Sequence, residues 1–226
     1  MEKAEELQTF KVVIIGDSYT GKTSLAYRLC TGKFYEKLET TIGVDFFEKI
    51  LLINNNRIRL QLWDSAGQER FRKSMTTHYY RNVDAIVFVY DISSEGSFES
   101  LNQWIEEYKH FTIPDKIEKI LIGTKNDLTN SKRIQSITAK KFADKYEMEF
   151  YETSSKNDED KKKIDNIFKT LAERLLKERP DVLENKGSLK LSKLQSISTK
   201  VIDAKEGNDK IDKEKIGRGK KKCCGN

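Results

Sequence analysis

Apolar residues follow two alternating patterns along the chain as far as residue 178. Short, mostly apolar runs predict strands, and apolar residues spaced three or four apart predict amphipathic helices between them. The predicted strands span 10–15, 44–53, 57–64, 84–91, 117–123 and 149–153, and the predicted helices span 24–30, 97–111, 136–146 and 158–177. This alternation predicts an α/β fold with a six-stranded, mostly parallel sheet and helices on both of its faces.

One strand pair is expected to be antiparallel. Residues 44–53 and 57–64 are separated only by the asparagines at positions 54–56, whose side chains favour tight turns. We therefore predict a β-hairpin here. Residues 32–43, which precede the hairpin, lack apolar periodicity and predict a loop.

The pattern fades after Pro180. Residues 181–222 hold no aromatic residue and only scattered aliphatic ones among Lys, Ser, Asn and Asp, a composition that predicts a disordered linker. A transient amphipathic helix in this segment is the alternative. We therefore expect a folded domain at 8–178, a flexible linker at 179–222 and a short C-terminal end at 223–226.

Charge is distributed unevenly over the 226 residues. The net charge is +6, and residues 181–226 carry +5 of it, because they hold twelve Lys or Arg against seven Asp or Glu. A nearly neutral domain with a basic tail favours contact between the tail and an anionic membrane surface. Nucleic acid is not an expected partner.

Targeting signals and cysteines narrow the class further. No apolar run approaches the roughly 20 residues of a membrane-spanning helix, and the first residues lack a signal-peptide pattern. Glu2 stands where N-myristoylation requires glycine. Cys30 is expected to be a small buried residue of a helix, and the three cysteines form no disulfide framework or zinc pattern. We expect the protein to stay on the cytosolic side.

The segment 16–23, Gly-Asp-Ser-Tyr-Thr-Gly-Lys-Thr, matches the phosphate-binding pattern G-x-x-x-x-G-K-[ST]. Gly16 and Gly21 allow the backbone to direct its N–H groups at a polyphosphate. Lys22 would face the β- and γ-phosphates, and the Thr23 hydroxyl would bind Mg²⁺. A strand before the segment and a helix after it disfavour a chance glycine turn. The residues expected to contact phosphate are Gly16, Asp17, Ser18, Tyr19, Thr20, Gly21, Lys22, Thr23 and Ser24.

A second phosphate-facing segment, Asp-Ser-Ala-Gly-Gln at 64–68, follows the hairpin. Asp64 can hold Mg²⁺ through water, and Gly67 can offer its N–H to a γ-phosphate. Gln68 can orient an attacking water molecule. An ordinary polar turn is the alternative, which the preceding phosphate loop disfavours.

Two later segments predict the choice of base. Asp127, in Thr-Lys-Asn-Asp at 124–127, can accept from both the ring N–H and the 2-amino group of guanine, which adenine does not offer in that arrangement. A site of this kind rejects the wrong base by leaving buried polar groups unpaired. In Ser154, Ser155 and Lys156, a backbone N–H can meet the guanine carbonyl oxygen.

In this order, the segments 16–23, 41–43, 64–68, 124–127 and 154–156 make the chain resemble a small GTPase of the Ras superfamily. Ile-Gly-Val-Asp-Phe at 42–46 and Tyr-Tyr-Arg-Asn at 79–82 resemble Rab proteins. The resemblance covers about residues 8–178 and the last few residues. Segment 70–79 with His78, Asn82 and residues 88–91 is similar to a Golgi- and autophagy-associated Rab subgroup.

The resemblance implies a P-loop GTPase that converts GTP and water to GDP and phosphate, slowly when alone, to regulate vesicle traffic. Lys22 and Gln68 would be catalytic, Thr41 would complete the Mg²⁺ shell, and Phe34 would stack beside the guanine. Phe46, Trp63 and Tyr79 match an exposed aromatic trio that effectors contact, with core packing as the alternative. The implied partners are an exchange factor, an activating protein, effectors, a GDP-dissociation inhibitor and the prenylation escort machinery.

Several positions depart from the family pattern. Thr124 replaces the usual asparagine, and Tyr19 and Thr20 replace asparagine and valine. Ser65 and Ser155 replace threonine and alanine. Because Tyr19 is bulky, we expect it to alter nucleotide exchange. These departures support one alternative, a GTPase-like adaptor that binds nucleotide poorly. A second alternative, an ATP-dependent P-loop enzyme, conflicts with the guanine-specific carboxylate.

The end of the chain resembles the doubly prenylated end of Rab proteins. Cys223 and Cys224 follow three lysines at 220–222. Two lipid chains anchor a protein stably where one does so only marginally, and nearby basic residues add attraction to anionic lipid. A C-a-a-X signal beginning at Cys223 is weakened by Gly225, and unmodified thiols are the other alternative. We expect the protein to cycle between cytosol and the cytosolic face of endomembranes, with the Golgi or vesicles suspected.

Overall fold

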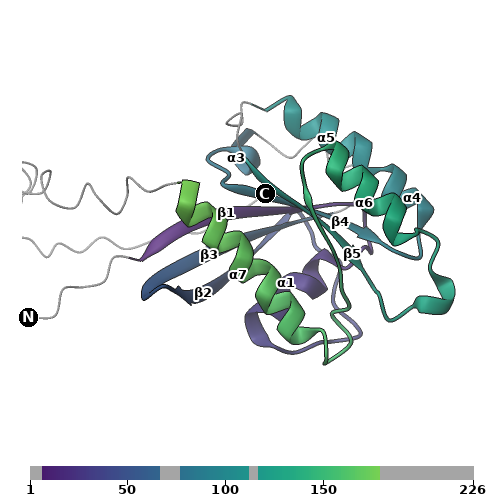
Figure 1. Cartoon of the computed structure of the whole chain (residues 1–226), viewed down its shortest axis with the longest axis horizontal. Coiled ribbons are helices and arrows are strands. Elements are labelled where there is room, and N and C mark those ends of the chain that lie inside the picture. The colour runs from purple at the N-terminus through teal and green to yellow at the C-terminus, as the bar shows by residue number, and fades with distance from the viewer. Residues whose placement is uncertain (1–6, 67–76, 112–116, 179–226) are drawn as a thin grey trace, which may run out of the picture. The chain divides into compact units, whose positions relative to one another are not determined.

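The computed structural model describes residues 7–66, 77–111 and 117–178 (Figure 1). The chain divides into two units, 1–179 and 180–226, and the described residues all lie in the first. The strands are β1 (Gln8–Ile15), β2 (Val44–Ile53), β3 (Asn56–Ser65), β4 (Ala85–Asp91), β5 (Glu118–Thr124) and β6 (Glu149–Glu152). The helices are α1 (Lys22–Thr31), α3 (Thr77–Tyr80), α4 (Glu95–Glu99), α5 (Leu101–Lys109), α6 (Ser136–Lys145) and α7 (Lys161–Glu178), with a 3₁₀ helix at Thr129–Ser131.

The six strands form one sheet in the order β2-β3-β1-β4-β5-β6. Only β2 and β3 pair antiparallel, and every other neighbouring pair is parallel. The predicted six-stranded, mostly parallel sheet is therefore confirmed. The predicted linker at 179–222 and the end at 223–226 lie outside the described residues.

Successive residues of the central strands face opposite sides of the sheet, and both sides are covered. Val12 and Ile14 of β1 pack in a core with α1 and α7, whereas Val13 and Ile15 pack in a second core with α3, α5 and α6. Figure 1 shows α7 across one face and α5 and α6 together on the other. Because residues 12–15 of β1, 85–90 of β4 and 120–122 of β5 are buried on both faces, these runs are apolar without alternation.

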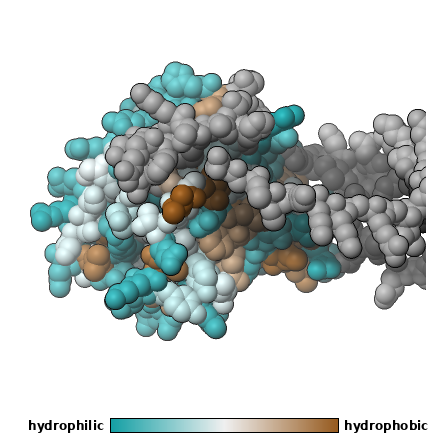
Figure 2. All heavy atoms as spheres, turned by 180° about the vertical axis from the view of Figure 1, so that it is seen from behind, coloured by the Kyte–Doolittle hydropathy of each residue, from teal (hydrophilic) through white to brown (hydrophobic). Residues whose placement is uncertain are grey.

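The predicted hairpin is present, with a shorter turn than three asparagines. Asn54 and Asn55 have φ values of 50° and 62°, and Asn56 already belongs to β3. Positive φ at both central residues is what the tightest two-residue hairpin requires, and asparagine tolerates it. β2 lies at the sheet edge and carries exposed apolar side chains, of which Leu52 and Phe46 have the highest exposed fractions. On the face of the molecule that Figure 2 shows, hydrophilic residues divide the hydrophobic surface into separate areas.

The helix predicted at 97–111 is two helices in the structure. α4 begins after Ser94, whose Oγ accepts from the Ser97 backbone N–H at 3.3 Å, and α5 begins after Ser100. α7 begins at Lys161, three residues later than predicted at 158. α3 and the 3₁₀ helix were not predicted, because four and three residues are too short to show a helical period.

The carboxyl ends of β1, β3, β4 and β5 lie along one edge of the sheet, since β1 is parallel to β3 and β4, and β4 to β5. Ligands of such sheets bind beyond this edge. Within the part of the chain described here, no helix combines the length and apolarity needed to cross a bilayer. Cys30 of α1 is partly buried rather than fully buried, and burial raises the pKa of its thiol to about 11.

Candidate functional site

Residues 16–21 of the segment 16–23 form the connection between β1 and α1, and Lys22 and Thr23 are the first residues of α1. Gly16 has a φ of 148°, and a Cβ there would lie 2.1 Å from the carbonyl oxygen of Val89 in β4. Gly21, with a φ of 88°, is the residue before the first turn of α1. Both positions therefore need glycine, Gly16 because another strand passes so close and Gly21 because of its left-handed backbone.

Lys22 is only 5% exposed although its charge would normally keep it in water. Its Nζ donates to the carbonyl oxygen of Asp17 at 2.8 Å, which holds the ammonium group over the segment. Asp17 is itself fixed, because the indole Nε1–H of the buried Trp104 donates to its Oδ1 at 2.9 Å. The cation is thus held in place before any ligand is bound.

Three oxygen-bearing side chains from separate elements meet next to Lys22. Thr23 Oγ1 of α1 donates to Asp64 Oδ2 of β3 at 2.6 Å. Thr41 Oγ1, from the loop before β2, lies 2.9 Å from Thr23 Oγ1 and 3.2 Å from Asp64 Oδ2. The predicted magnesium-binding residues are therefore brought together.

The Asp64 carboxylate fits a bound cation. Its Oδ1 is buried and has no hydrogen-bond partner among the residues described. Burial raises the pKa of Asp64 to about 6, although the Thr23 hydrogen bond and the Lys22 charge lower it. Within the described residues, no three His, Cys, Asp or Glu side chains form a metal cluster. One carboxylate with hydroxyls suits Mg²⁺, which keeps waters and takes further oxygens from substrate phosphates.

The base-side segments also lie together. Ser154 Oγ donates to Asp127 Oδ1 at 2.5 Å, which orients the carboxylate. The Ser154 N–H donates to Asp160 Oδ2 at 2.7 Å, and the Lys156 N–H donates to Ser154 Oγ at 3.1 Å. Of the three backbone N–H groups at 154–156, that of Ser155 alone has no partner among the described residues. Ser155 is therefore the donor available to a carbonyl oxygen of a base.

Thr124 joins the two halves of the site despite replacing the expected asparagine. Its Oγ1 lies 2.5 Å from the carbonyl oxygen of Thr20 and 2.9 Å from that of Tyr90. The hydroxyl thus ties the end of β5 to the phosphate loop and to β4. A threonine is long enough for this link, because its hydroxyl reaches both carbonyl oxygens.

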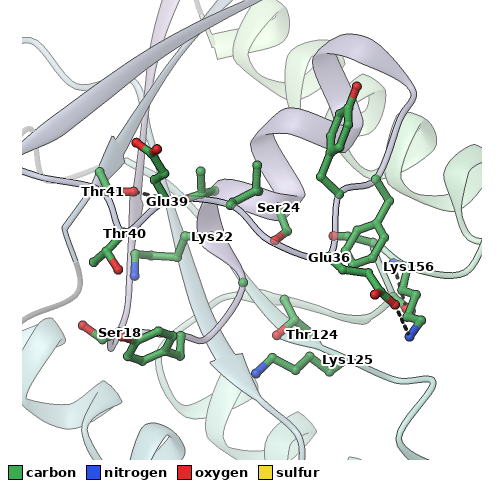
Figure 3. A pocket seen from close by; sticks show the side chains of 18 of the residues that line it. Ser18, Lys22, Ser24, Glu36, Glu39, Thr40, Thr41, Thr124, Lys125 and Lys156 are labelled. Atoms are coloured by element: carbon green, nitrogen blue, oxygen red, sulfur yellow. Dashed lines mark hydrogen bonds and ion pairs between the residues drawn. The ribbon is translucent and has the colours of Figure 1, made fainter.

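A cavity of about 410 Å³ connects these groups. The side chains of Ser18, Lys22, Thr41, Thr124 and Lys125 lie around it in Figure 3. The predicted residues that line it are Ser18, Tyr19, Gly21, Lys22, Thr23, Ser24, Phe34, Thr41, Thr124, Lys125, Asp127, Ser154, Ser155 and Lys156. The predicted residues that do not line it are Gly16, Asp17, Thr20 and Asp64. Asp17, Thr20 and Asp64 instead accept hydrogen bonds from the lining residues Lys22, Thr124 and Thr23. Gly67 and Gln68 lie outside the described residues, as do Cys223 and Cys224.

Tyr19, the bulkiest departure from the family pattern, is compatible with an open cavity. It adopts a φ of 62° and its side chain is 79% exposed. A left-handed conformation is costly for a non-glycine residue. Its ring is thus largely in solvent at the cavity wall, and it does not close the phosphate loop.

The structure adds residues that the sequence did not indicate. Glu36 Oε1 and Lys156 Nζ form an ion pair at 3.1 Å that links the loop before β2 to the loop after β6 (Figure 3). Buried Arg28 binds Asp158 Oδ1 at 2.5 Å and joins α1 to that second loop. These pairs connect residues more than 100 positions apart, and no local pattern marks them.

The three aromatic side chains predicted to be exposed pack against one another, and the prediction of exposure is wrong for Tyr79. Phe46 is 49% exposed and packs edge-on against half-buried Trp63, with ring centroids 5.7 Å apart. Tyr79 is only 3% exposed, and its hydroxyl donates to the carbonyl oxygen of Trp63 at 2.9 Å. Burial raises the pKa of the Tyr79 hydroxyl well above its usual value. Tyr79 is therefore a buried support for the other two rings.

Comparison with known proteins gives consistent matches. A family model described as the Ras family matches residues 11–177. The mouse protein "Ras-related protein Rab-33A" is 47% identical over 175 residues, which cover 77% of this chain and 74% of the mouse protein. The Caenorhabditis elegans protein "Ras-related protein Rab-33" is 45% identical over 178 residues, covering 78% of this chain and 58% of the worm protein.

Proposed function

Since the chain belongs to the Rab group of the Ras family and is a GTPase that regulates vesicle traffic, we propose that the described cavity binds GTP and GDP. The protein then acts as a switch between the two nucleotide states. One observation carries the proposal. Thr23 and Thr41, both bonded to Asp64, line the same cavity as Asp127 and Ser155. Phosphates and guanine would thus be bound by opposite ends of one cavity.

The switch depends on Thr41, which belongs to a loop without regular structure. Mg²⁺, when bound, supplies positive charge at the phosphate oxygens, and Thr23, Thr41 and Asp64 would hold it. The N–H of Gly67 is expected to contact the γ-phosphate. Hydrolysis would release both contacts and free the segments 35–45 and 65–82. Effectors that contact Phe46 and Trp63 next to these segments would sense the change.

Catalysis would use Lys22 to stabilise charge and Gln68 to orient water. No arginine lines the cavity among the described residues, and we expect an activating protein to supply that charge. Intrinsic turnover should then be slow, on the order of 10⁻⁴ s⁻¹, the scale of Ras. An activating protein would add about 10⁵-fold.

Gln68→Leu is expected to leave GTP binding intact and to lower stimulated hydrolysis by at least roughly tenfold, because leucine cannot orient the attacking water. Phosphate release with and without an activating protein of the family measures this. Gln61→Leu, at a partly buried position of β3 that does not line the cavity, is the matched control and should hydrolyse GTP like the wild type. Unchanged stimulated turnover in Gln68→Leu would remove Gln68 from the mechanism.

Nucleotide selectivity tests the function as a whole. Binding of GTP, GDP and ATP to the full chain should be measured with Mg²⁺, followed by phosphate release. We expect tight binding of both guanine nucleotides, no competition by ATP, and slow hydrolysis, because the Asp127 carboxylate accepts two donors that only guanine presents. Absent guanine binding would instead indicate a GTPase-like adaptor, and competition by ATP would indicate the second alternative.

Membrane attachment would complete the cycle. We expect Cys223 and Cys224 to be prenylated and to hold the protein on the cytosolic face of Golgi or vesicle membranes, with the adjacent lysines attracting anionic lipid. An exchange factor, a GDP-dissociation inhibitor and the prenylation escort machinery would act on this form. The mass of the C-terminal peptide from a eukaryotic host tests it, and an unmodified peptide would contradict anchoring.

A further inference from the structure

An ion pair lies directly behind one wall of the cavity. Lys125 Nζ and Asp91 Oδ2 are 2.7 Å apart. Lys125 lines the cavity, whereas Asp91 does not. The pair follows from the sheet, since Asp91 at the end of β4 is in register with Thr124 at the end of β5, and Lys125 is the next residue.

The Asp91 carboxylate is held by the chain around it. Its Oδ1 accepts from both the backbone N–H and the hydroxyl of Ser93, at 2.8 and 2.7 Å. The Asp91 N–H donates to Ser97 Oγ at 3.1 Å. Burial raises the pKa of Asp91, but the Lys125 ion pair and the Ser93 hydrogen bonds together lower it below its usual value. The side chain, only 10% exposed, is thus a fixed anion at neutral pH.

The backbone of Lys125 is also held in an unusual conformation. Its φ is 59°, in the left-handed region that lysine rarely adopts. Its carbonyl oxygen accepts from the Leu128 N–H at 2.9 Å, which closes the turn that carries Asp127. Figure 3 shows Lys125 extended beside Thr124. With its ammonium group bound to Asp91, the aliphatic part of Lys125 remains to form the cavity wall.

We propose that Asp91 is a positioning residue for guanine-nucleotide retention, acting through Lys125. This rests on the function proposed above. The fixed carboxylate holds the Lys125 side chain along the wall and keeps its charge away from the nucleotide. Without the carboxylate, Lys125 loses its fixed direction, and the wall between Thr124 and Asp127 becomes mobile. The bound nucleotide is then released faster.

Asp91→Asn in the full chain tests the proposal. Asparagine keeps an oxygen for the Ser93 donors and removes only the charge that pairs with Lys125. Dissociation of a fluorescent GDP analogue should be about tenfold faster than from the wild type, the scale of one lost charge-assisted bond. Ser93→Ala, which loosens the carboxylate and leaves the ion pair, should give a smaller increase of about threefold.

The matched control is Glu152→Gln. Glu152 and Lys132 form an ion pair of the same 2.7 Å length and similar burial, with 13% of the Glu152 side chain exposed. Neither residue lines the cavity. Glu152→Gln should leave the dissociation rate within about twofold of wild type. An equal acceleration in this control would mean that lost stability, not positioning, releases the nucleotide.

A double-mutant cycle separates positioning from general destabilisation. If Asp91 acts through Lys125, the double variant Asp91→Asn, Lys125→Gln should release GDP no faster than Lys125→Gln alone. Additive effects, or a wild-type rate in Asp91→Asn, would overturn the proposal. Failure of the wild-type chain to bind guanine nucleotide would instead contradict the proposed function.

Discussion

Replacing Asp127 with asparagine is expected to weaken GDP and GTP binding by roughly 10³-fold or more and to favour xanthine nucleotides instead. The carboxylate has two acceptor oxygens, and Ser154 fixes its orientation through Oδ1. An asparagine amide has one acceptor and one donor group. It therefore cannot accept from both guanine donors, but it can donate to the oxygen that xanthine carries in place of the 2-amino group. Competition between GDP and XDP for the variant measures the change.

Two variants limit the interpretation of that experiment. Asp144→Asn removes an exposed carboxylate of α6 far from the cavity and should bind GDP like the wild type. Asp127→Ala removes the acceptors and supplies no donor, so it should lose guanine binding and gain none for xanthine. If Asp127→Asn retained full affinity for GDP, the base would have to be recognised elsewhere.

Thr23→Ala is expected to lower affinity for GDP and GTP by about 10²-fold when Mg²⁺ is present, because a hydroxyl that meets Asp64 and Thr41 is lost. The size of the effect should depend on the metal. In the presence of a chelator, wild type and variant should differ little, since the hydroxyl then has no cation to bind. Nucleotide dissociation rates measured with Mg²⁺ and with a chelator check both statements.

Thr23→Ser is the control for that substitution. Serine keeps the hydroxyl and removes only a methyl group, so its affinity in Mg²⁺ should approach that of the wild type. A loss in Thr23→Ala that is equally large with a chelator would assign the hydroxyl a purely structural role, through its bond to Asp64. It would then not be a metal ligand.

The strands were predictable because their burial is visible in the residues themselves. In β4 every residue from Ala85 to Asp91 is buried, and no other placement of so apolar a run is stable. The break at Ser100 was not predictable, since Phe98, Leu101 and Ile105 keep helical spacing across it. The spacing of apolar residues shows which face of a helix is buried. It does not show where one helix ends and the next begins.

The site was predictable where one segment supplies the chemistry. The glycines and Lys22 of the phosphate loop, and Asp127 after β5, lie where their local patterns indicate. Contacts between distant segments were not predictable. Tyr79 of α3 is buried because it packs in the second core, where its hydroxyl also donates to the carbonyl oxygen of Trp63 in β3. Asp158 is joined to Arg28, 130 positions away, only by folding, and it looks like any other surface carboxylate in the sequence.

The hydrogen bond from Trp104 to Asp17 makes intrinsic tryptophan fluorescence a probe of the phosphate loop. There are two tryptophans in the protein. Trp63 lies beside the half-exposed ring of Phe46, whereas the indole N–H of Trp104 is bound to the segment that would cradle phosphate. Indole emission depends on the hydrogen bond and polarity at that nitrogen. The two tryptophans therefore report on different parts of the domain: Trp104 on the phosphate loop and Trp63 on the aromatic contact with Phe46. Replacing one of them by phenylalanine leaves the emission of the other to be measured alone, without an attached dye.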